Sequence, residues 1–178
     1  MDEKINVLIS KEEVENRIQE IADEISAKYA GKVVHLVGVL KGSVFFMCEL
    51  AKRLSIPVTM DFMSVSSYGN GTKSSGIVKL IKDLDETIEG RDVILVEDIM
   101  DSGRTLSYLV NLMKERKPAS FMIVTLLDKP ERRECAITPD YYGFVVPNEF
   151  VVGYGLDYAG TYRNLPFVGV LKDEVHAD

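Results

Sequence analysis

The sequence is poor in cysteine, because its 178 residues include only Cys48 and Cys135. Two cysteines are too few for a disulfide framework, and their separation has no resemblance to metal-ligand spacing. Cys48 lies among apolar residues, which favours a small core side chain over a reactive thiol. These cysteines therefore argue against the disulfide-rich classes of protein.

Positive charge is also scarce, since 21 Lys and Arg face 28 Asp and Glu and give a net charge of -7. Broad affinity for nucleic acid needs a basic surface, so we expect no nucleic-acid partner. No apolar run is long enough to cross a bilayer, and the N-terminal sequence MDEKINVLIS is too polar for a signal peptide. We therefore expect a cytoplasmic protein without a membrane partner.

Internal repeats, linkers and low-complexity segments are absent as well. A chain of 178 residues with 46% hydrophobic residues fits a single domain, here residues 1–178. Helix-like and strand-like segments alternate along it. A capping box at Ser10 to Glu13 and an apolar face from Val14 to Tyr29 predict a first helix that ends at Gly31.

Further helices are predicted at residues 43–54 and 104–115. Strands are predicted at residues 33–40, 58–66, 77–84, 93–97, 121–127, 141–146 and 150–154. This alternation indicates an α/β domain with a mainly parallel, doubly wound sheet. His35 lies in an apolar strand, where we expect a core or interface histidine and no metal ligand.

Residues 66–76, SSYGNGTKSSG, are polar, rich in Gly and Ser, and without periodicity. A loop of this length inside a compact domain is usually functional or disordered. A plain hairpin tip is the alternative. The sequence leaves both interpretations open at this point.

The segment VILVEDIMDSGRTL, residues 93–106, carries the clearest functional signal. A buried strand runs into Glu97 and Asp98, and Asp101 follows before a small-residue turn and a helix start. Ligands of open parallel sheets bind just outside the carboxyl ends of the strands. The turn and the helix N-terminus offer free backbone N–H groups, which suit a phosphate.

Carboxylates beside a phosphate site require a partner between them. Ribose hydroxyls can donate to carboxylates, and Mg2+ can bridge oxygen ligands. The segment therefore indicates a sugar phosphate with vicinal hydroxyls. A dinucleotide or P-loop site is the alternative, but the sequence contains neither G-x-G-x-x-G nor G-x-x-x-x-G-K-[ST].

The same segment resembles the phosphoribosyl pyrophosphate motif of the type I phosphoribosyltransferases: an apolar strand, two acids, two apolar residues, then Asp-Ser-Gly and Thr. The resemblance covers almost the whole chain. Leu40-Lys41-Gly42, Ser67-Tyr68, LDKP at 127–130 and FVVGYGLDY at 150–158 are similar, in order, to the hypoxanthine-guanine branch in its short bacterial-type form. Arg104 departs from the family, which more often has Leu or Lys there.

The resemblance implies the type I phosphoribosyltransferase fold, with residues 66–76 as a mobile loop and a small hood from the N-terminal segment and residues 147–178. It implies a purine salvage enzyme that transfers the phosphoribosyl group from 5-phosphoribosyl 1-pyrophosphate (PRPP) to N9 of hypoxanthine or guanine. The products would be IMP or GMP and pyrophosphate. Mg2+ is the implied cofactor, and the implied assembly is a homodimer or homotetramer.

The resemblance also implies roles for individual residues. Asp101 would be the catalytic base near purine N7, and closure of the 66–76 loop would exclude water from an oxocarbenium-like transition state. Phosphate and ribose would be held by Glu97, Asp98, Asp101, Ser102, Gly103, Arg104 and Thr105. Pyrophosphate would be held by Leu40, Lys41, Gly42, Ser67, Tyr68 and Arg163, with an unusual peptide geometry in the first three.

The purine would be bound by Lys129, Phe150, Val151 and Asp157, and Mg2+ by Glu97, Asp98 and Asp157. Without the resemblance, Lys41 and Lys129 are better explained as solvated surface charges, and Phe150 fits a core aromatic as well as it fits a ligand contact. The resemblance favours the ligand-binding role for all three. An ammonium group donates hydrogen bonds and accepts none, so Lys129 suits a 6-oxopurine and not adenine.

Two rival functions remain at this stage. One is an RNA-binding regulator with the same fold. RNA binding would need a basic face, whereas this chain is acidic overall. The other is a related enzyme that uses adenine, xanthine, uracil or orotate. Lys129 and the FVVGYGLDY segment favour 6-oxopurines but do not separate hypoxanthine, guanine and xanthine.

Overall fold

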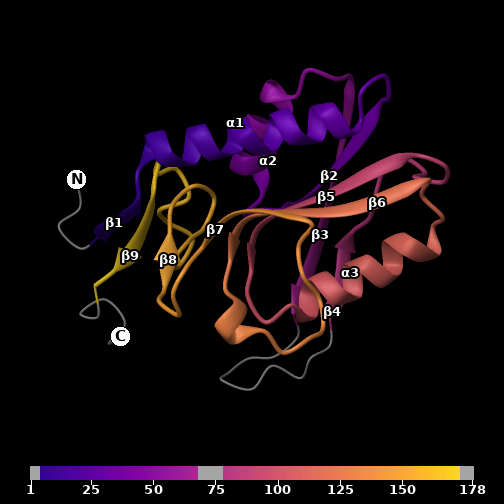
Figure 1. The fold of residues 1–178 in the computed structure, drawn as a ribbon. Helices are drawn as coiled ribbons and strands as arrows, with labels where there is room; N and C mark the ends of the chain where they lie inside the picture. Colours follow the sequence, from indigo (N-terminus) through magenta and orange to yellow (C-terminus); the bar gives the residue numbers. More distant parts are fainter. Residues whose placement is uncertain (1–4, 68–77, 173–178) are drawn as a thin grey trace.

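The computed structural model describes residues 5–67 and 78–172. They form a large sheet with helices on both faces, and a small separate sheet beside it (Figure 1). The helices are α1 (Lys11–Lys28), α2 (Val44–Arg53), α3 (Arg104–Glu115) and the 3-10 turn η1 (Pro130–Arg132). The strands are β1 (Ile5–Ile9), β2 (Val34–Leu40), β3 (Val58–Ser67), β4 (Val78–Lys82), β5 (Asp92–Met100), β6 (Ser120–Asp128), β7 (Tyr141–Val145), β8 (Val151–Val152) and β9 (Val168–Leu171).

The large sheet has the strand order β4-β3-β2-β5-β6-β7. Its strands pair in parallel except β4, which runs antiparallel to β3 at one edge. Helices α1 and α2 cover one face and α3 covers the other (Figure 1). This arrangement confirms the predicted α/β class with a mainly parallel, doubly wound sheet.

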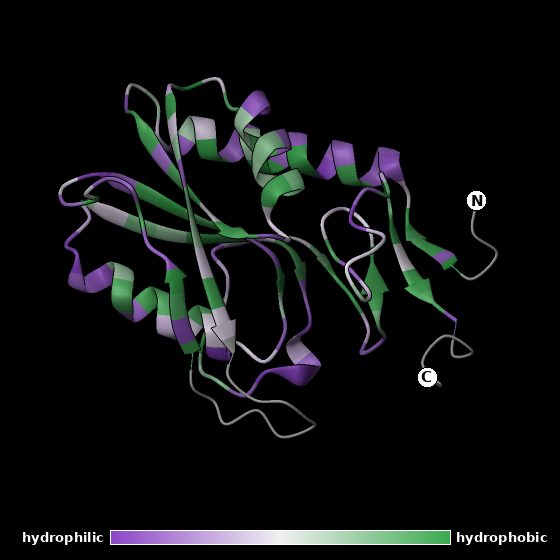
Figure 2. Ribbon diagram, turned by 180° about the vertical axis from the view of Figure 1, so that it is seen from behind, coloured by the Kyte–Doolittle hydropathy of each residue, from purple (hydrophilic) through white to green (hydrophobic). Residues whose placement is uncertain are grey.

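Each face of the large sheet has its own apolar cluster, and β5 shows why. Ile94 and Val96 pack with α1 and α2, whereas Val93 and Leu95 pack with α3. All four side chains are fully buried. Successive side chains of a strand point to opposite faces, so a strand covered on both sides is apolar throughout. The strands accordingly form a green, hydrophobic centre between helices with purple outer surfaces (Figure 2).

Helix α1 begins as the sequence predicts. The N–H of Glu13 donates to Ser10 Oγ at 3.2 Å, and the N–H of Ser10 donates to Glu13 Oε2 at 2.8 Å, which completes a capping box. The buried face of the helix consists of Val14, Ile18, Ile21, Ala22, Ile25 and Ser26. Gly31, with φ of 77°, lies in the turn that follows.

The small sheet has the order β1-β9-β8, and all of its pairs are antiparallel. It joins β1 to β8 and β9, which lie far from it in the sequence, at one side of the large sheet (Figure 1). The sequence did not predict β1 or β9. Strand β8 is shorter than the predicted 150–154, because the chain turns at Gly153, where φ is 92°.

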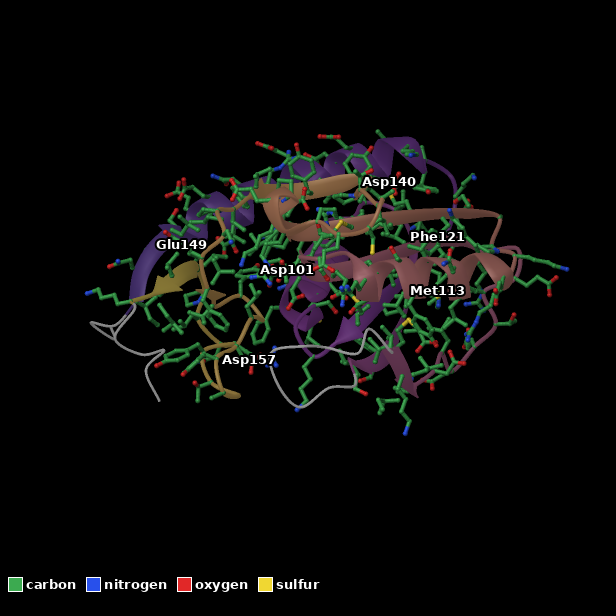
Figure 3. All side chains as sticks on the ribbon, turned by 90° about the horizontal axis from the view of Figure 1, so that it is seen from below. Asp101, Met113, Phe121, Asp140, Glu149 and Asp157 are labelled. Atoms are coloured by element: carbon green, nitrogen blue, oxygen red, sulfur yellow. The ribbon has the colours of Figure 1, made fainter. Side chains whose placement is uncertain are left out.

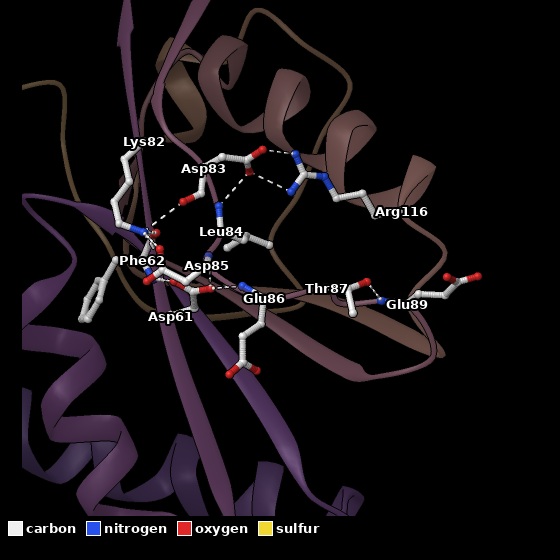
Figure 4. Close-up of polar contacts among 10 residues, drawn as sticks. All are labelled: Asp61, Phe62, Lys82, Asp83, Leu84, Asp85, Glu86, Thr87, Glu89 and Arg116. Atoms are coloured by element: carbon white, nitrogen blue, oxygen red, sulfur yellow. Dashed lines mark hydrogen bonds and ion pairs between the residues drawn. The ribbon is translucent and has the colours of Figure 1, made fainter.

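A buried carboxylate fixes the base of the β3–β4 hairpin (Figure 4). Asp61 on β3 is 5% exposed, and it accepts the N–H groups of Phe62 at 2.7 Å and Asp85 at 2.8 Å. Burial acts to raise the pKa of Asp61, but the backbone hydrogen bonds outweigh it and lower the pKa. Lys82 on β4 donates to the carbonyl of Phe62 at 2.9 Å. Asp61 and Lys82 thus hold both strands to the segment after β4.

The predicted loop at residues 66–76 lies largely outside the described residues, and so does Tyr68. Ser66 and Ser67 are the last residues of β3. Beyond β4, Asp83 accepts two hydrogen bonds from Arg116, at 2.7 and 2.8 Å, which attach this segment to the end of α3 (Figure 4).

His35 is 3% exposed, and its Nδ1 forms a 2.7 Å hydrogen bond with Thr59 Oγ1, as expected of a core histidine. Cys48 is only half-buried, so its predicted place in the core is wrong. It lies on α2 near the surface, because the buried positions of that helix go to Phe46, Met47 and Leu50. Within the described chain, none of the helices has the length and apolar character that a bilayer span requires.

Candidate active site

A short turn connects the end of β5 to α3 and has the features of an anion site. Gly103 is the N-cap of α3 with φ of 82°, a left-handed conformation that favours glycine. The N–H groups of residues 101 to 103 donate to no acceptor within the described part of the chain. The N–H of Arg104, the first of α3, donates to Ser102 Oγ at 3.4 Å, and the first turn of a helix offers no intrahelical acceptor to its N–H groups. Together they form a cluster of donors at the positive end of a helix.

Glu97 and Asp98 lie just before this turn, on β5, which continues to Met100. The predicted strand end at Glu97 is therefore wrong, because residues 97, 99 and 100 still pair with β6. Burial, and then the neighbouring Asp98, raise the pKa of Glu97 well above its usual value. Burial also raises the pKa of Asp98, against the hydrogen bond from the Ile99 N–H. Glu97 is buried and Asp98 half-buried, and two adjacent carboxylates in such surroundings are stabilised by hydroxyl donors or a cation.

The Leu40-Lys41-Gly42 turn touches Asp98 directly. The Leu40–Lys41 peptide is cis, in agreement with the unusual geometry predicted there. A Cβ on Gly42 would lie 1.6 Å from Asp98 Oδ2, and a Cβ on Gly155 would lie 1.9 Å from the Gly42 carbonyl oxygen. A side chain on Gly42 would therefore displace the Asp98 carboxylate, whereas one on Gly155 would meet the backbone. Three segments that are distant in the sequence therefore meet at the acidic pair.

A cavity of about 390 Å³ opens beside Asp98, within the range of small-molecule pockets. Glu149 and Asp157 lie on the opposite side of the molecule from Met113 and Phe121, with Asp101 between them (Figure 3). The lining residues are Asp98, Ile99, Asp101, Lys129, Arg132, Asn148, Glu149, Phe150, Val151, Leu156 and Asp157.

Lys129 is 7% exposed and donates from Nζ to the Glu149 carbonyl at 2.6 Å. Burial lowers its pKa, and the positive charge of Arg132 acts in the same direction against the opposing effect of Asp101. A solvated surface charge is thereby excluded for this lysine. The residue also lines the cavity.

Phe150 is 44% exposed and lies edge-to-face against Tyr158, with ring centroids 5.6 Å apart and planes at 87°. A plain core aromatic is therefore excluded for this residue. A second, larger cavity of about 510 Å³ lies against the same 148–150 segment and is bordered by β1 and β9. We assign the chemistry to the smaller cavity, since Asp98, Asp101 and Lys129 line only that one.

Asp101 lies opposite Arg132, with Oδ1 2.8 Å from the Arg132 Nε. The N–H is not aligned on the oxygen, so the contact is an ion pair without hydrogen-bond geometry. Sequence reasoning missed Arg132 and Asn148, although both line the cavity. The arginine pair that follows LDKP after Glu131 was the available signal for this part of the site.

Arg163 is held near the acidic pair by its own hairpin. Nη2 lies 2.6 Å from Asp157 Oδ1, and Nη1 donates to the Gly155 carbonyl at 2.6 Å. Among the described residues, no three His, Cys, Asp or Glu side chains are grouped closely enough to hold a metal ion.

Several predicted residues lie away from the cavity walls. Ser67 ends β3, and residues 102 to 105 form the turn and the start of α3, next to the cavity but outside its lining. Arg104 forms an ion pair with Glu134 at 2.5 Å. Lys41 is exposed. The predicted phosphate turn and the predicted base pocket are thus adjacent but separate surfaces.

A donor-rich turn after two strand carboxylates, with a small-molecule cavity beside it, indicates an enzyme that binds a phosphate group next to a second ligand. The chain matches the phosphoribosyl transferase domain family over residues 9–159. It is 55% identical over 170 residues to a hypoxanthine-guanine phosphoribosyltransferase of Bacillus subtilis, across 96% of this chain and 94% of that protein. The chain belongs to the hypoxanthine-guanine phosphoribosyltransferases, a branch of that family.

A solved structure of the Trypanosoma cruzi hypoxanthine phosphoribosyltransferase, in complex with the product IMP, is similar with a TM-score of 0.92 and 42% identity, and the match covers 98% of each chain. The chain is also 60% identical over 172 residues to the bifunctional protein TilS/HprT of Listeria innocua. That match covers 97% of this chain but only 26% of the bifunctional protein. The chain therefore spans about a quarter of the length of that relative.

Proposed function

We propose that the chain transfers the phosphoribosyl group of PRPP to N9 of hypoxanthine or guanine and releases IMP or GMP and pyrophosphate. The observation that carries this proposal is the cavity that places the Lys129 ammonium group, the Phe150 ring and the Asp101 carboxylate around one space. The phosphate-type turn at residues 101–103 lies directly beside it.

Lys129 and Phe150 account for base recognition in this proposal. The ammonium group donates to the 6-oxygen of the purine and, once N7 has lost its proton, to N7, while adenine would present an amino donor to it. Phe150 stacks on the purine face, and the main chain of Val151 contacts the base edge. A buried lysine facing the wrong donor leaves a polar group unpaired, which is how such sites reject a near-isostere.

The turn and the acidic pair account for binding of the sugar phosphate. The donors of residues 101 to 105, including the hydroxyls of Ser102 and Thr105, hold the 5-phosphate. Glu97 and Asp98 accept from the ribose 2- and 3-hydroxyls, which supply the donors that these buried carboxylates require. Arg163 and the Leu40-Lys41-Gly42 turn face the pyrophosphate, and arginine suits that role through charge-assisted hydrogen bonds.

The reaction follows from these positions. Purine N9 attacks the anomeric carbon as the bond to pyrophosphate breaks, with inversion and an oxocarbenium-like transition state. The proton on N7 passes to Asp101, whose carboxylate lies in the cavity wall. The nearby carboxylates stabilise positive charge on the sugar ring. No protein nucleophile is required.

We include Mg2+ in the proposal, held by Glu97, Asp98 and Asp157 directly or through ribose and water. The adjacent carboxylates of Glu97 and Asp98, whose pKa values are raised, fit a cation, and Mg2+ commonly combines one or two carboxylates with substrate oxygens. When bound, it supplies stabilisation of charge on the leaving pyrophosphate. We further propose that the small sheet forms a hood and that the cytoplasmic protein is a homodimer or homotetramer.

The proposal is tested by offering PRPP and Mg2+ with hypoxanthine, guanine, xanthine and adenine in parallel and measuring nucleotide formation. We expect IMP and GMP, with no AMP above background. Preference for adenine would contradict the role of Lys129. A folded protein that binds PRPP without forming product from any base, but binds RNA, would favour the regulator instead.

A further inference from the structure

Three consecutive carbonyl groups of the phosphate turn bond to the segment that follows β6. The Met100 carbonyl accepts the Lys129 N–H at 2.9 Å, and the Ser102 carbonyl accepts the Glu134 N–H at 2.9 Å. Between them, the Asp101 carbonyl accepts Nη1 of Arg133 at 3.2 Å. The middle contact is therefore the only one of the three made by a side chain.

This pattern determines where the opposite side of each peptide points. In a trans peptide, the N–H of one residue is directed away from the carbonyl of the residue before it. Carbonyls 100, 101 and 102 face the 129–134 segment, so the N–H groups of residues 101, 102 and 103 face away from it. Those are the N–H groups without an acceptor in the described part of the chain.

Arg133 is anchored behind the turn. Its Nη2 pairs with the carboxylate of Asp128, the last residue of β6. The two side chains are only 14% and 11% exposed. The Arg133 Cδ lies 3.2 Å from the position that a Cβ on Gly103 would occupy, so the arginine also packs beneath the glycine of the turn.

We propose that Arg133, oriented by Asp128, is a positioning residue for the 5-phosphate site, a proposal that rests on the function given above. The planar guanidinium holds the β6 carboxylate with one nitrogen and the Asp101 carbonyl with another, and so fixes the peptide that aims the N–H of Ser102. Arg133 does not touch the ligand itself. Lysine has one nitrogen in place of the fork and cannot make both contacts in this geometry.

The test compares the dissociation constants of IMP and inosine, because their ratio isolates the contribution of the 5-phosphate. In Arg133→Lys we expect the inosine-to-IMP ratio to fall about tenfold, the effect of one charge-assisted hydrogen bond, with inosine affinity unchanged. The KM for PRPP should rise while the KM for hypoxanthine stays constant. Asp128→Asn, which keeps an acceptor, should give a smaller fall in the ratio.

The chain offers a matched control in Arg17→Lys. Arg17 likewise bonds two carbonyls, those of Tyr142 and Gly143, and the carboxylate of Glu20, but it lies on α1. We expect its replacement to affect stability and leave the ratio unchanged. If Arg133→Lys does not fold, Asp128→Asn carries the test.

An unchanged ratio in the folded Arg133 and Asp128 variants would overturn the positioning role, and so would an equal loss of affinity for inosine and IMP. Failure of the proposed function is distinguishable, since the wild-type chain would then form no IMP and would not prefer IMP over inosine.

Discussion

Replacement of Lys129 by glutamine tests the base-recognition account most sharply. Lys129 is 7% exposed, and its ammonium group already donates to the Glu149 carbonyl. Glutamine can retain a donor to that carbonyl, so the pocket wall is preserved. It removes the positive charge and introduces an oxygen that can accept from the amino group of adenine.

A hydrogen bond from a charged group contributes roughly 1.5–3 kcal/mol, which corresponds to a factor of roughly 10 to 150 in kcat/KM. We therefore expect Lys129→Gln to lower kcat/KM for hypoxanthine by roughly that factor. The kcat/KM for adenine should stay constant or rise. The ratio of kcat/KM for hypoxanthine to kcat/KM for adenine should thus fall by about tenfold or more.

The assay is steady-state nucleotide formation at saturating PRPP and Mg2+, with each base varied in turn. Lys32→Gln is the control, because Lys32 is largely exposed and forms an ion pair with Asp92 away from the cavity. An unchanged hypoxanthine-to-adenine ratio in a folded Lys129→Gln protein would refute the assignment of Lys129 to the purine 6-oxygen.

Three further predictions concern other parts of the molecule. Gly42→Ala should lower kcat/KM for PRPP by about 100-fold with little change in thermal stability, because its Cβ would lie 1.6 Å from Asp98 Oδ2 and displace that carboxylate; normal kinetics would contradict the contact. Ser10→Ala should cost about 1 kcal/mol of unfolding free energy in a urea titration and leave kcat unchanged, since it removes only a helix cap. Burial lowers the pKa of His35 below 6.5 in the folded chain, so the unfolded chain binds more protons and stability should fall as the pH drops below 6.5. Urea titrations at about pH 7.5 and 5.5 should show a larger loss for wild type than for His35→Gln, and equal losses would disprove the effect.

Much of the fold could be predicted from the sequence, because β2, β5 and β6 each contain a run of apolar residues and α1 has both a cap and a regular apolar face. Strands β1 and β9 could not. Each is short, and Val7 in β1 is 51% exposed, so the pattern of a buried strand is weak. Their pairing brings together the two ends of the chain, which local periodicity does not encode.

The site was predicted in part for a similar reason. The acidic pair and the turn after it form one continuous segment, and the structure keeps them together. The end of β5 was placed too early, because two carboxylates are unusual within a strand. Arg132 and Arg133 were missed, since charged residues after a proline are typical of a solvated loop. In the structure, Arg132 lies beside Asp101 and Arg133 pairs with Asp128.

The central claim, that residues 101–105 hold phosphate while Lys129 and Phe150 hold a 6-oxopurine, is tested most directly by a crystal structure of the chain with IMP. We predict the 5-phosphate at the N–H groups of this turn, the 6-oxygen within hydrogen-bond distance of Lys129 Nζ, and the base against Phe150. IMP in the other cavity beside β1, or a phosphate away from the turn, would contradict the account.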